Sequence, residues 1–115
     1  MSNNNRVLHV CYKPSLLLDQ EKLLVERGYE VVTVLGTDGL LAARELNNYD
    51  LILLAEGASS GERGVAVRFL TDQISFVPIL AVGWPDTDLM GVGQPIQAGD
   101  PELVLNAILG KLKIA

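Results

Sequence analysis

The sequence has few of the residues on which disulfide, metal and nucleic-acid chemistry depend. It contains one cysteine and one histidine, and only 5% of its 115 residues are aromatic. One cysteine cannot form an internal disulfide, and neither a metal-ligand set nor a serine–histidine–aspartate set can be assembled around His9. The nine lysines and arginines form no block and the net charge is -5, which argues against a nucleic-acid surface.

Long apolar runs are absent as well. No run approaches the roughly 20 residues of a membrane span, and residues 1–5 lack the basic and then apolar pattern of a signal peptide. We therefore expect a cytoplasmic protein that binds neither a membrane nor a nucleic acid. Residues 1–5 are expected to form a disordered tail, and residues 6–115 a single domain, since 49% of the chain is hydrophobic.

One apolar stretch, residues 49–56, organises the rest of the chain. It ends abruptly in a glycine- and serine-rich loop at residues 57–64. Continuous apolar residues over this length are typical of a strand buried on both faces in the middle of a parallel sheet. In an open α/β sheet, functional residues lie just beyond the carboxyl ends of such strands, so Ala55 and its neighbours are the first candidates.

Strands and helices alternate on both sides of this stretch. The alternation predicts right-handed βαβ units, and five strands favour a flavodoxin-like, doubly wound parallel sheet in the order 2-1-3-4-5. The fourth helix is expected to be shortened or missing, because three glycines and two prolines fall within residues 83–97. The predicted strands are residues 6–11, 29–35, 50–55, 77–82 and 94–97, and the predicted helices are residues 14–28, 39–46, 64–74 and a last one from residue 101 onward.

Four segments carry a resemblance to a known family: residues 26–33, 49–54, 77–81 and 100–103. Together with the order of the elements, they resemble the receiver domain of two-component response regulators over nearly the whole chain. The resemblance implies a bacterial signalling protein in which an aspartate after the third strand accepts a phosphoryl group. It also implies an acidic pair that holds Mg²⁺ after the first strand, a threonine or serine after the fourth and a lysine after the fifth.

All of these functional positions are changed in this chain. The acceptor position falls on Ala55, the acidic pair on Cys11 and Tyr12, the hydroxyl on Gly83 and the lysine on Gln97. We refer to these five residues as the vacated pocket. A methyl group cannot accept a phosphoryl group, and a thiol and a phenol are poor ligands for Mg²⁺, which prefers carboxylate oxygens. The resemblance therefore implies a pseudo-receiver without cofactor, metal or enzyme activity, which acts in signalling as a phosphorylation-independent protein-interaction module.

The partner is expected to be another protein or a second copy of the chain in a homodimer. A shortened fourth helix would expose apolar sheet in residues 84–98, which a partner could cover. Trp84, Met90 and Val92 are the candidate interaction residues there. Trp84 has two possible roles: it either closes the vacated pocket as a lid or anchors a partner.

Two other functions remain open from the sequence. A cysteine that ends the first strand, before a helix, also resembles the phosphocysteine carriers of sugar phosphotransfer, with Cys11 as the nucleophile. Against this function, residues 12–14 contain no glycine that would let the backbone wrap around an anion, and Pro14 lacks an N–H donor. The second alternative is a sensor that binds a small ligand in the vacated pocket beside Ala55 and Gly83.

Overall fold

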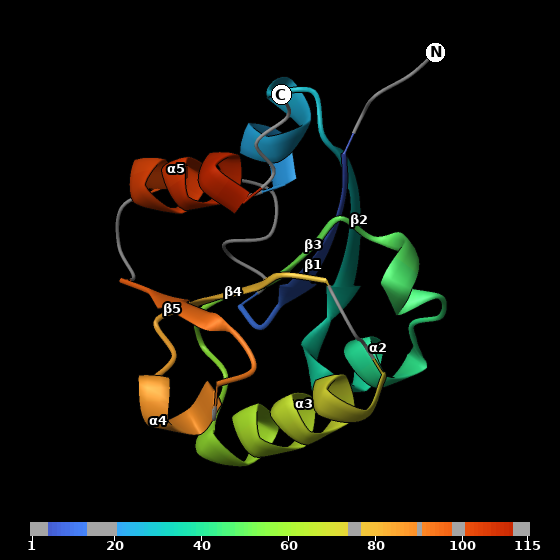
Figure 1. Cartoon of the computed structure of the whole chain (residues 1–115), viewed down its shortest axis with the longest axis vertical. Coiled ribbons are helices and arrows are strands. Elements are labelled where there is room, and N and C mark those ends of the chain that lie inside the picture. The colour runs from blue at the N-terminus through green and yellow to red at the C-terminus, as the bar shows by residue number, and fades with distance from the viewer. Residues whose placement is uncertain (1–4, 14–20, 74–76, 90, 98–100, 112–115) are drawn as a thin grey trace.

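The computed structural model of the chain describes residues 5–13, 21–73, 77–89, 91–97 and 101–111. Five strands form one sheet, and helices cover both of its faces (Figure 1). Residues 21–26 are helical and precede β2. The other elements are β1 (Arg6–Cys11), β2 (Glu30–Leu35), α2 (Gly36–Ala42), η1 (Leu46–Asn48), β3 (Leu51–Leu54), α3 (Ser60–Gln73), β4 (Ile79–Val82), α4 (Asp86–Leu89), β5 (Gln94–Ile96) and α5 (Pro101–Lys111).

The strand order β2-β1-β3-β4-β5 confirms the predicted sheet, and every neighbouring pair of strands is parallel. The register pairs Val10 of β1 with Leu54 of β3, and Leu54 with Ala81 of β4. The residues that follow these three strands therefore lie along one edge of the sheet, which we call the carboxyl edge. In a doubly wound sheet this is the edge where functional residues gather.

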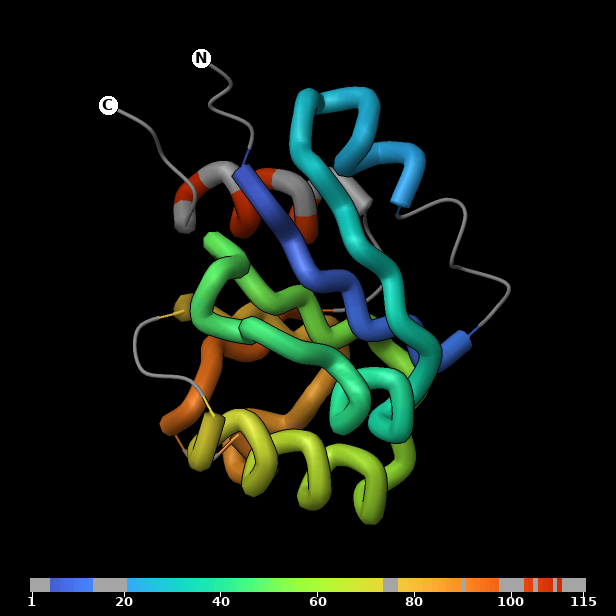
Figure 2. Tube along the Cα trace, turned by 90° about the vertical axis from the view of Figure 1, so that its right-hand side faces the viewer, coloured from blue at the N-terminus to red at the C-terminus, as the bar shows by residue number. Residues whose placement is uncertain are grey.

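The core has one layer on each face of the sheet. On one face, residues such as Leu8 and Ile52 pack against α2, α3 and α4. On the other face, Val7 and Leu53 pack against α5 and the helical residues 21–26. Figure 2 shows these helices on opposite sides of the strands. All four residues of β3 are buried, so this strand is central, as its apolar sequence predicts.

The helix before β2 ends where the sequence predicts. Gly28 has a φ of 92°, and its N–H donates a hydrogen bond to the Val25 carbonyl at 3.0 Å. The Tyr29 N–H donates to the Leu24 carbonyl at 3.1 Å, which completes a Schellman motif. Glycine suits this position because a side chain would make the left-handed conformation costly.

Parts of the predicted tail and first helix, residues 1–4 and 14–20, lie outside the described residues. Asn5, which the sequence places in the tail, accepts a hydrogen bond from the Glu30 N–H at 2.9 Å and so extends the contact between β1 and β2. Among the residues that the structure describes, no helix is both long enough and apolar enough to cross a membrane.

The helix between β2 and β3 begins earlier than predicted. It starts at Gly36 instead of Gly39, because Gly36 adopts a φ of 66° and turns the chain directly out of β2. Leu40 is fully buried and fixes the helix on the sheet. The predicted end at Leu46 is also wrong: α2 stops at Ala42, and Leu46 begins the separate 3₁₀ turn η1.

The helix after β3 also begins earlier, at Ser60 instead of Gly64. Its start is a capping box. The Ser59 Oγ accepts a hydrogen bond from the Glu62 N–H at 3.2 Å, and the Glu62 carboxylate accepts one from the Ser59 N–H at 2.9 Å. These two bonds satisfy backbone donors that would otherwise lack partners, so the glycines on both sides do not prevent the helix from starting.

Replacing Ser59 with alanine is expected to lower the free energy of unfolding by about 1 kcal/mol, because the Glu62 N–H loses its acceptor. The measurement is the urea midpoint followed by circular dichroism. Glu62→Gln is the matched control: its amide oxygen can still accept the Ser59 N–H, so its midpoint should stay close to that of the unchanged chain. Equal midpoints for all three proteins would contradict the capping role.

The fourth helix is shortened, as predicted, but it is not missing. α4 consists of the four residues Asp86–Leu89, and Leu89 is fully buried under the sheet. The Val92 N–H donates to the Leu89 carbonyl at 2.8 Å, and the chain then enters β5. Pro95 lies in this edge strand, where its missing N–H costs least.

Candidate functional site

Ala55 lies directly after β3 at the carboxyl edge, and only 1% of its surface is exposed. Both of its backbone groups are bonded. Its N–H donates to the Val10 carbonyl at 2.9 Å, and its carbonyl accepts a hydrogen bond from the Trp84 Nε1–H at 3.0 Å. The position where the resemblance implies a phosphoryl acceptor therefore holds a buried methyl group, and its backbone carbonyl is bonded to an indole ring.

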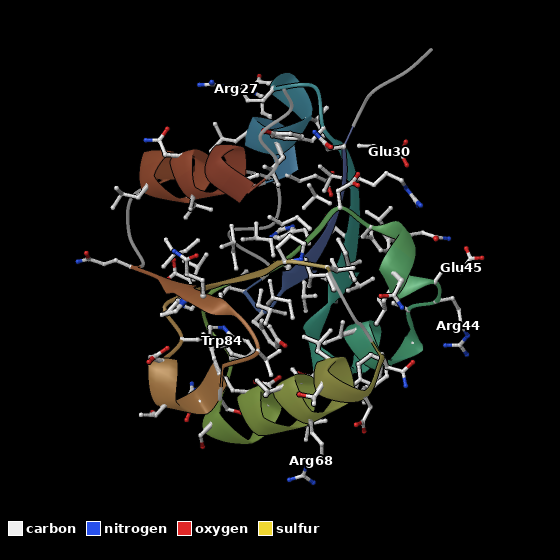
Figure 3. The ribbon with its side chains drawn as sticks, viewed as in Figure 1. Arg27, Glu30, Arg44, Glu45, Arg68 and Trp84 are labelled. Atoms are coloured by element: carbon white, nitrogen blue, oxygen red, sulfur yellow. The ribbon has the colours of Figure 1, made fainter. Side chains whose placement is uncertain are left out.

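Trp84 is the side chain that closes this edge. It follows β4 and is only 4% exposed. Figure 3 shows it inside the molecule, whereas Arg44 and Arg68 point outwards. Its ring meets the Tyr12 ring edge-on, with 5.9 Å between the centroids. Of the two roles considered for Trp84, a lid agrees with this burial, and an exposed anchor for a partner does not.

Cys11 lies at the end of β1, in the first position of the implied acidic pair. Its side chain is 2% exposed, and the thiol donates a hydrogen bond to the Lys13 carbonyl at 3.1 Å. Burial raises the pKa of the Cys11 thiol, so the thiol form dominates at neutral pH. A buried, protonated thiol is a weak nucleophile, since the thiolate is the reactive form.

Tyr12 occupies the second position of the pair and begins a short chain of hydroxyl bonds. Its Oη lies 2.9 Å from the Thr37 Oγ1, and the Thr37 hydroxyl donates to the Glu62 carbonyl at 3.1 Å. Because Thr37 has a single hydroxyl proton, Tyr12 must donate to it. Burial raises the pKa of the Tyr12 phenol, and the Glu62 charge adds to that rise.

Lys13 covers the loop that follows β3. Gly57 has a φ of 108°, and a Cβ there would lie 2.6 Å from the Lys13 Cγ. The aliphatic part of the lysine thus takes the space that a side chain at residue 57 would need, although Lys13 as a whole is exposed. Glycine is required at this position for both its conformation and its size.

The other predicted residues of the edge lie further out. Gly83 and Gln97 are exposed at the ends of β4 and β5, and the Gly83 N–H donates to the Ile96 carbonyl at 2.7 Å. Val92 is partly buried and packs against the core. Met90 is outside the described residues.

Arg63 is a residue of this region that the sequence pattern did not single out. Its guanidinium pairs with the Asp88 carboxylate at 2.6 Å and donates to the Ala58 carbonyl at 2.7 Å. These contacts join α3, the loop after β3 and α4. Asp88 lies 25 residues away in the sequence, and the other partner is a backbone carbonyl, so no local sequence motif indicates either contact.

The donor groups at the carboxyl edge do not fit Mg²⁺. Where the resemblance implies carboxylates, the structure has the Cys11 thiol, the Tyr12 phenol and the Ala55 methyl group. Within the described part of the chain, no three histidine, cysteine, aspartate or glutamate side chains come together in a way that could hold a metal ion. The edge is packed with aromatic and apolar groups.

Solved structures supply the decisive comparison, because no protein-family profile and no curated protein matches the sequence. The chemotaxis response regulator CheY4 of Vibrio cholerae is 23% identical and gives a TM-score of 0.72, with 95% of this chain and 99% of that chain covered. A CheY-like receiver domain protein from Methanospirillum hungatei is 20% identical, with a TM-score of 0.71 over 96% of this chain and 94% of that chain.

The chain has the receiver-domain fold. A third structure, of the histidine kinase ThkA in complex with the response regulator protein TrrA, matches with a TM-score of 0.73 and 21% identity, over 96% of this chain and 99% of that chain. All three identities are below 25%, so the likeness establishes the architecture. The chemistry of this receiver-like chain has to be argued from its own residues.

Proposed function

We propose that this receiver-like chain is a pseudo-receiver: a bacterial, cytoplasmic signalling module that binds a protein partner without being phosphorylated. The observation that carries the proposal is the closed carboxyl edge. Ala55 has no oxygen in its side chain, and its carbonyl is held by the buried Trp84 indole. An acceptor site has to admit a phosphoryl donor and hold a metal ion, and Cys11, Tyr12 and Ala55 supply no carboxylate for that metal ion.

A protein partner is supported by the kind of protein that shares the fold. The similar structures described above are of response regulators, which are signalling proteins, and one of them is a complex with a histidine kinase. The chain carries a net charge of -5 and no basic block, which favours a protein partner over a nucleic acid.

Neither of the alternatives gains support from the geometry. A phosphocysteine carrier needs an accessible thiolate, but the Cys11 thiol is buried and donates to a backbone carbonyl. A small-ligand sensor needs open volume beside Ala55, but Trp84 and Tyr12 pack over this position.

The test is the intact mass of the chain after incubation with acetyl phosphate and Mg²⁺, for the unchanged protein and for Cys11→Ala. We expect no added phosphoryl group in either sample, because Ala55 has no side-chain oxygen and the Cys11 thiol is buried. A receiver domain that has its acceptor aspartate serves as the positive control.

Two outcomes would contradict this expectation. A phosphoryl group that is lost in Cys11→Ala would make Cys11 the acceptor and favour the carrier function. One that is present in both proteins would mean that another residue accepts it, and the chain would then be a phosphorylated receiver after all.

A further inference from the structure

The described part of the chain exposes five large hydrophobic side chains, and three of them line one groove. These three, Leu35, Leu41 and Val65, are 59%, 38% and 47% exposed, and they come from the end of β2, from α2 and from the first turns of α3. Their groove has a volume of about 360 Å³, and Asp38 and Glu62 lie on its rim. We call it the α2–α3 groove.

Residues 84–98, which the sequence predicts as part of the docking region, offer no comparable surface among those of their residues that the structure describes. None of the described large hydrophobic residues in that segment is exposed, because Trp84 and Leu89 are buried and Val92 packs against the core. Exposed apolar side chains that gather in one place are better candidates for a binding site than scattered ones, which are common on protein surfaces. The α2–α3 groove is therefore the better candidate for a docking surface.

The shape of the groove follows from its backbone. α2 packs against α3, and the two helices lie side by side in Figures 1 and 2. Gly36 and Gly61 line the groove without side chains, and a Cβ at Gly36 would meet nothing within 4 Å. Thr37 also lines it, but its hydroxyl is already bonded to Tyr12 and to the Glu62 carbonyl. The Thr37 hydroxyl is therefore not available to a ligand, and we call the three apolar side chains that line the groove its floor.

The charge of the rim indicates what can bind. Asp38 and Glu62 are both exposed carboxylates, and no lysine, arginine or histidine lines the groove. A second copy of this chain, with its net charge of -5, would be repelled by the rim, and so would an anionic membrane surface. The complementary ligand has apolar side chains for the floor and cationic side chains for the rim.

We propose that the α2–α3 groove binds an amphipathic segment of a partner protein, which inserts aliphatic side chains between Leu35, Leu41 and Val65 and places lysine or arginine beside Asp38 and Glu62. The proposal rests on the function proposed above, because it identifies the surface through which a pseudo-receiver would bind its partner. Grooves between elements bind helical segments in this way, through apolar residues spaced three and four apart.

The test uses three synthetic helical peptides as probes. The first has leucine at helical spacing and lysine elsewhere; the second has glutamate in place of lysine; the third has serine in place of leucine. Each is titrated into the ¹⁵N-labelled full chain. We expect only the first to bind, with amide shifts concentrated in residues 35–41 and 61–65, and its affinity to fall at about 0.5 M NaCl as the rim charges are screened.

Substitutions in the chain separate the two parts of the proposal. Leu35→Ser combined with Val65→Ser is expected to lower the affinity for the leucine–lysine peptide by about tenfold or more, because apolar contact is lost. Asp38→Asn combined with Glu62→Gln should lower the same affinity about two- to fivefold, as expected for exposed charge pairs. Val25→Ser and Asp72→Asn change an exposed apolar residue and an exposed acid outside the groove, so they should leave the affinity unchanged.

Several results would overturn the proposal. These are binding of none of the peptides, amide shifts elsewhere in the chain, equal binding of the glutamate peptide, or equal weakening by the control substitutions. A dimer that dissociates in Leu35→Ser would make a second copy the occupant, and retention on anionic vesicles would make it a membrane. A phosphoryl group in the mass experiment would instead contradict the proposed function while leaving the peptide result intact, so the two failures are distinguishable.

Discussion

Replacing Trp84 with alanine is expected to lower the free energy of unfolding by about 3–5 kcal/mol, the usual cost of removing a large buried aromatic side chain. The ring is 4% exposed, packs edge-on against Tyr12 and lies against the core beneath the sheet. Alanine would leave a cavity at the carboxyl edge and deprive the Ala55 carbonyl of the indole donor. Urea unfolding, followed by circular dichroism, measures the loss.

Trp84→Phe separates packing from hydrogen bonding. Phenylalanine keeps most of the apolar contact but has no N–H. The free energy of unfolding of this variant should therefore fall by only about 1–3 kcal/mol, the cost of leaving a buried acceptor unpaired. If Trp84→Ala loses less than about 1 kcal/mol, the indole is a surface side chain and not a lid. Trp84 would then again be a candidate residue for anchoring a partner.

Much of the fold could be predicted because β2, β3 and β4 have continuous or β-branched apolar sequences. Residues 51–54 are the clearest case: four consecutive apolar residues predict a doubly buried strand, and all four are buried. The strand order followed from the alternation of strands and helices and from the handedness of their connections. The helix cap at Gly28 could be predicted equally well, because it depends on the conformation of a single residue.

Helix starts were less predictable because local signals competed. The capping box of Ser59 and Glu62 was present in the sequence, but glycines at 57, 61 and 64 favoured a loop, and the predicted start fell four residues late. At α2, Gly36 reads as a turn residue, yet its positive φ lets the helix follow β2 directly. At α3 one local signal outweighs another, and at α2 the backbone conformation of a single glycine decides where the helix starts.

The closure of the site depends on contacts between distant residues. The substituted residues of the vacated pocket could be identified one by one, but nothing in the local sequence indicates that the Trp84 N–H reaches the Ala55 carbonyl, 29 residues away. The same holds for Arg63 and Asp88. The α2–α3 groove is similar: Leu35 and Val65 look like core residues by type, and only the fold leaves them exposed.

Restoring the acceptor residue with Ala55→Asp is expected to destabilise the chain by about 3–5 kcal/mol at neutral pH, because a carboxylate would replace a methyl group at a position that is only 1% exposed. Ala55→Asn is the matched control. It has almost the same size without the charge, so its cost should be about 1–3 kcal/mol, that of overpacking. The difference between the two variants isolates the effect of the charge.

The pH dependence of that difference tests whether the edge is closed. In the folded Ala55→Asp variant, burial would raise the pKa of the introduced carboxyl group above its unfolded value of about 3.9. The folded state then binds more protons than the unfolded state between the two pKa values, so stability falls as pH rises through that window. The Ala55→Asp variant should therefore approach Ala55→Asn as the pH is lowered, and urea midpoints across the pH range measure this convergence.

The same variant also tests how much of a phosphoryl switch remains. Even with an aspartate in place of Ala55, we expect no phosphoryl group from acetyl phosphate and Mg²⁺, because Cys11 and Tyr12 supply no carboxylate for the metal ion. If Ala55→Asp is as stable as Ala55→Asn at neutral pH, the new carboxylate reaches solvent and the carboxyl edge is an open pocket. If it also becomes phosphorylated, one substitution separates this chain from a working receiver, and the expectation that Cys11 and Tyr12 prevent phosphorylation is wrong.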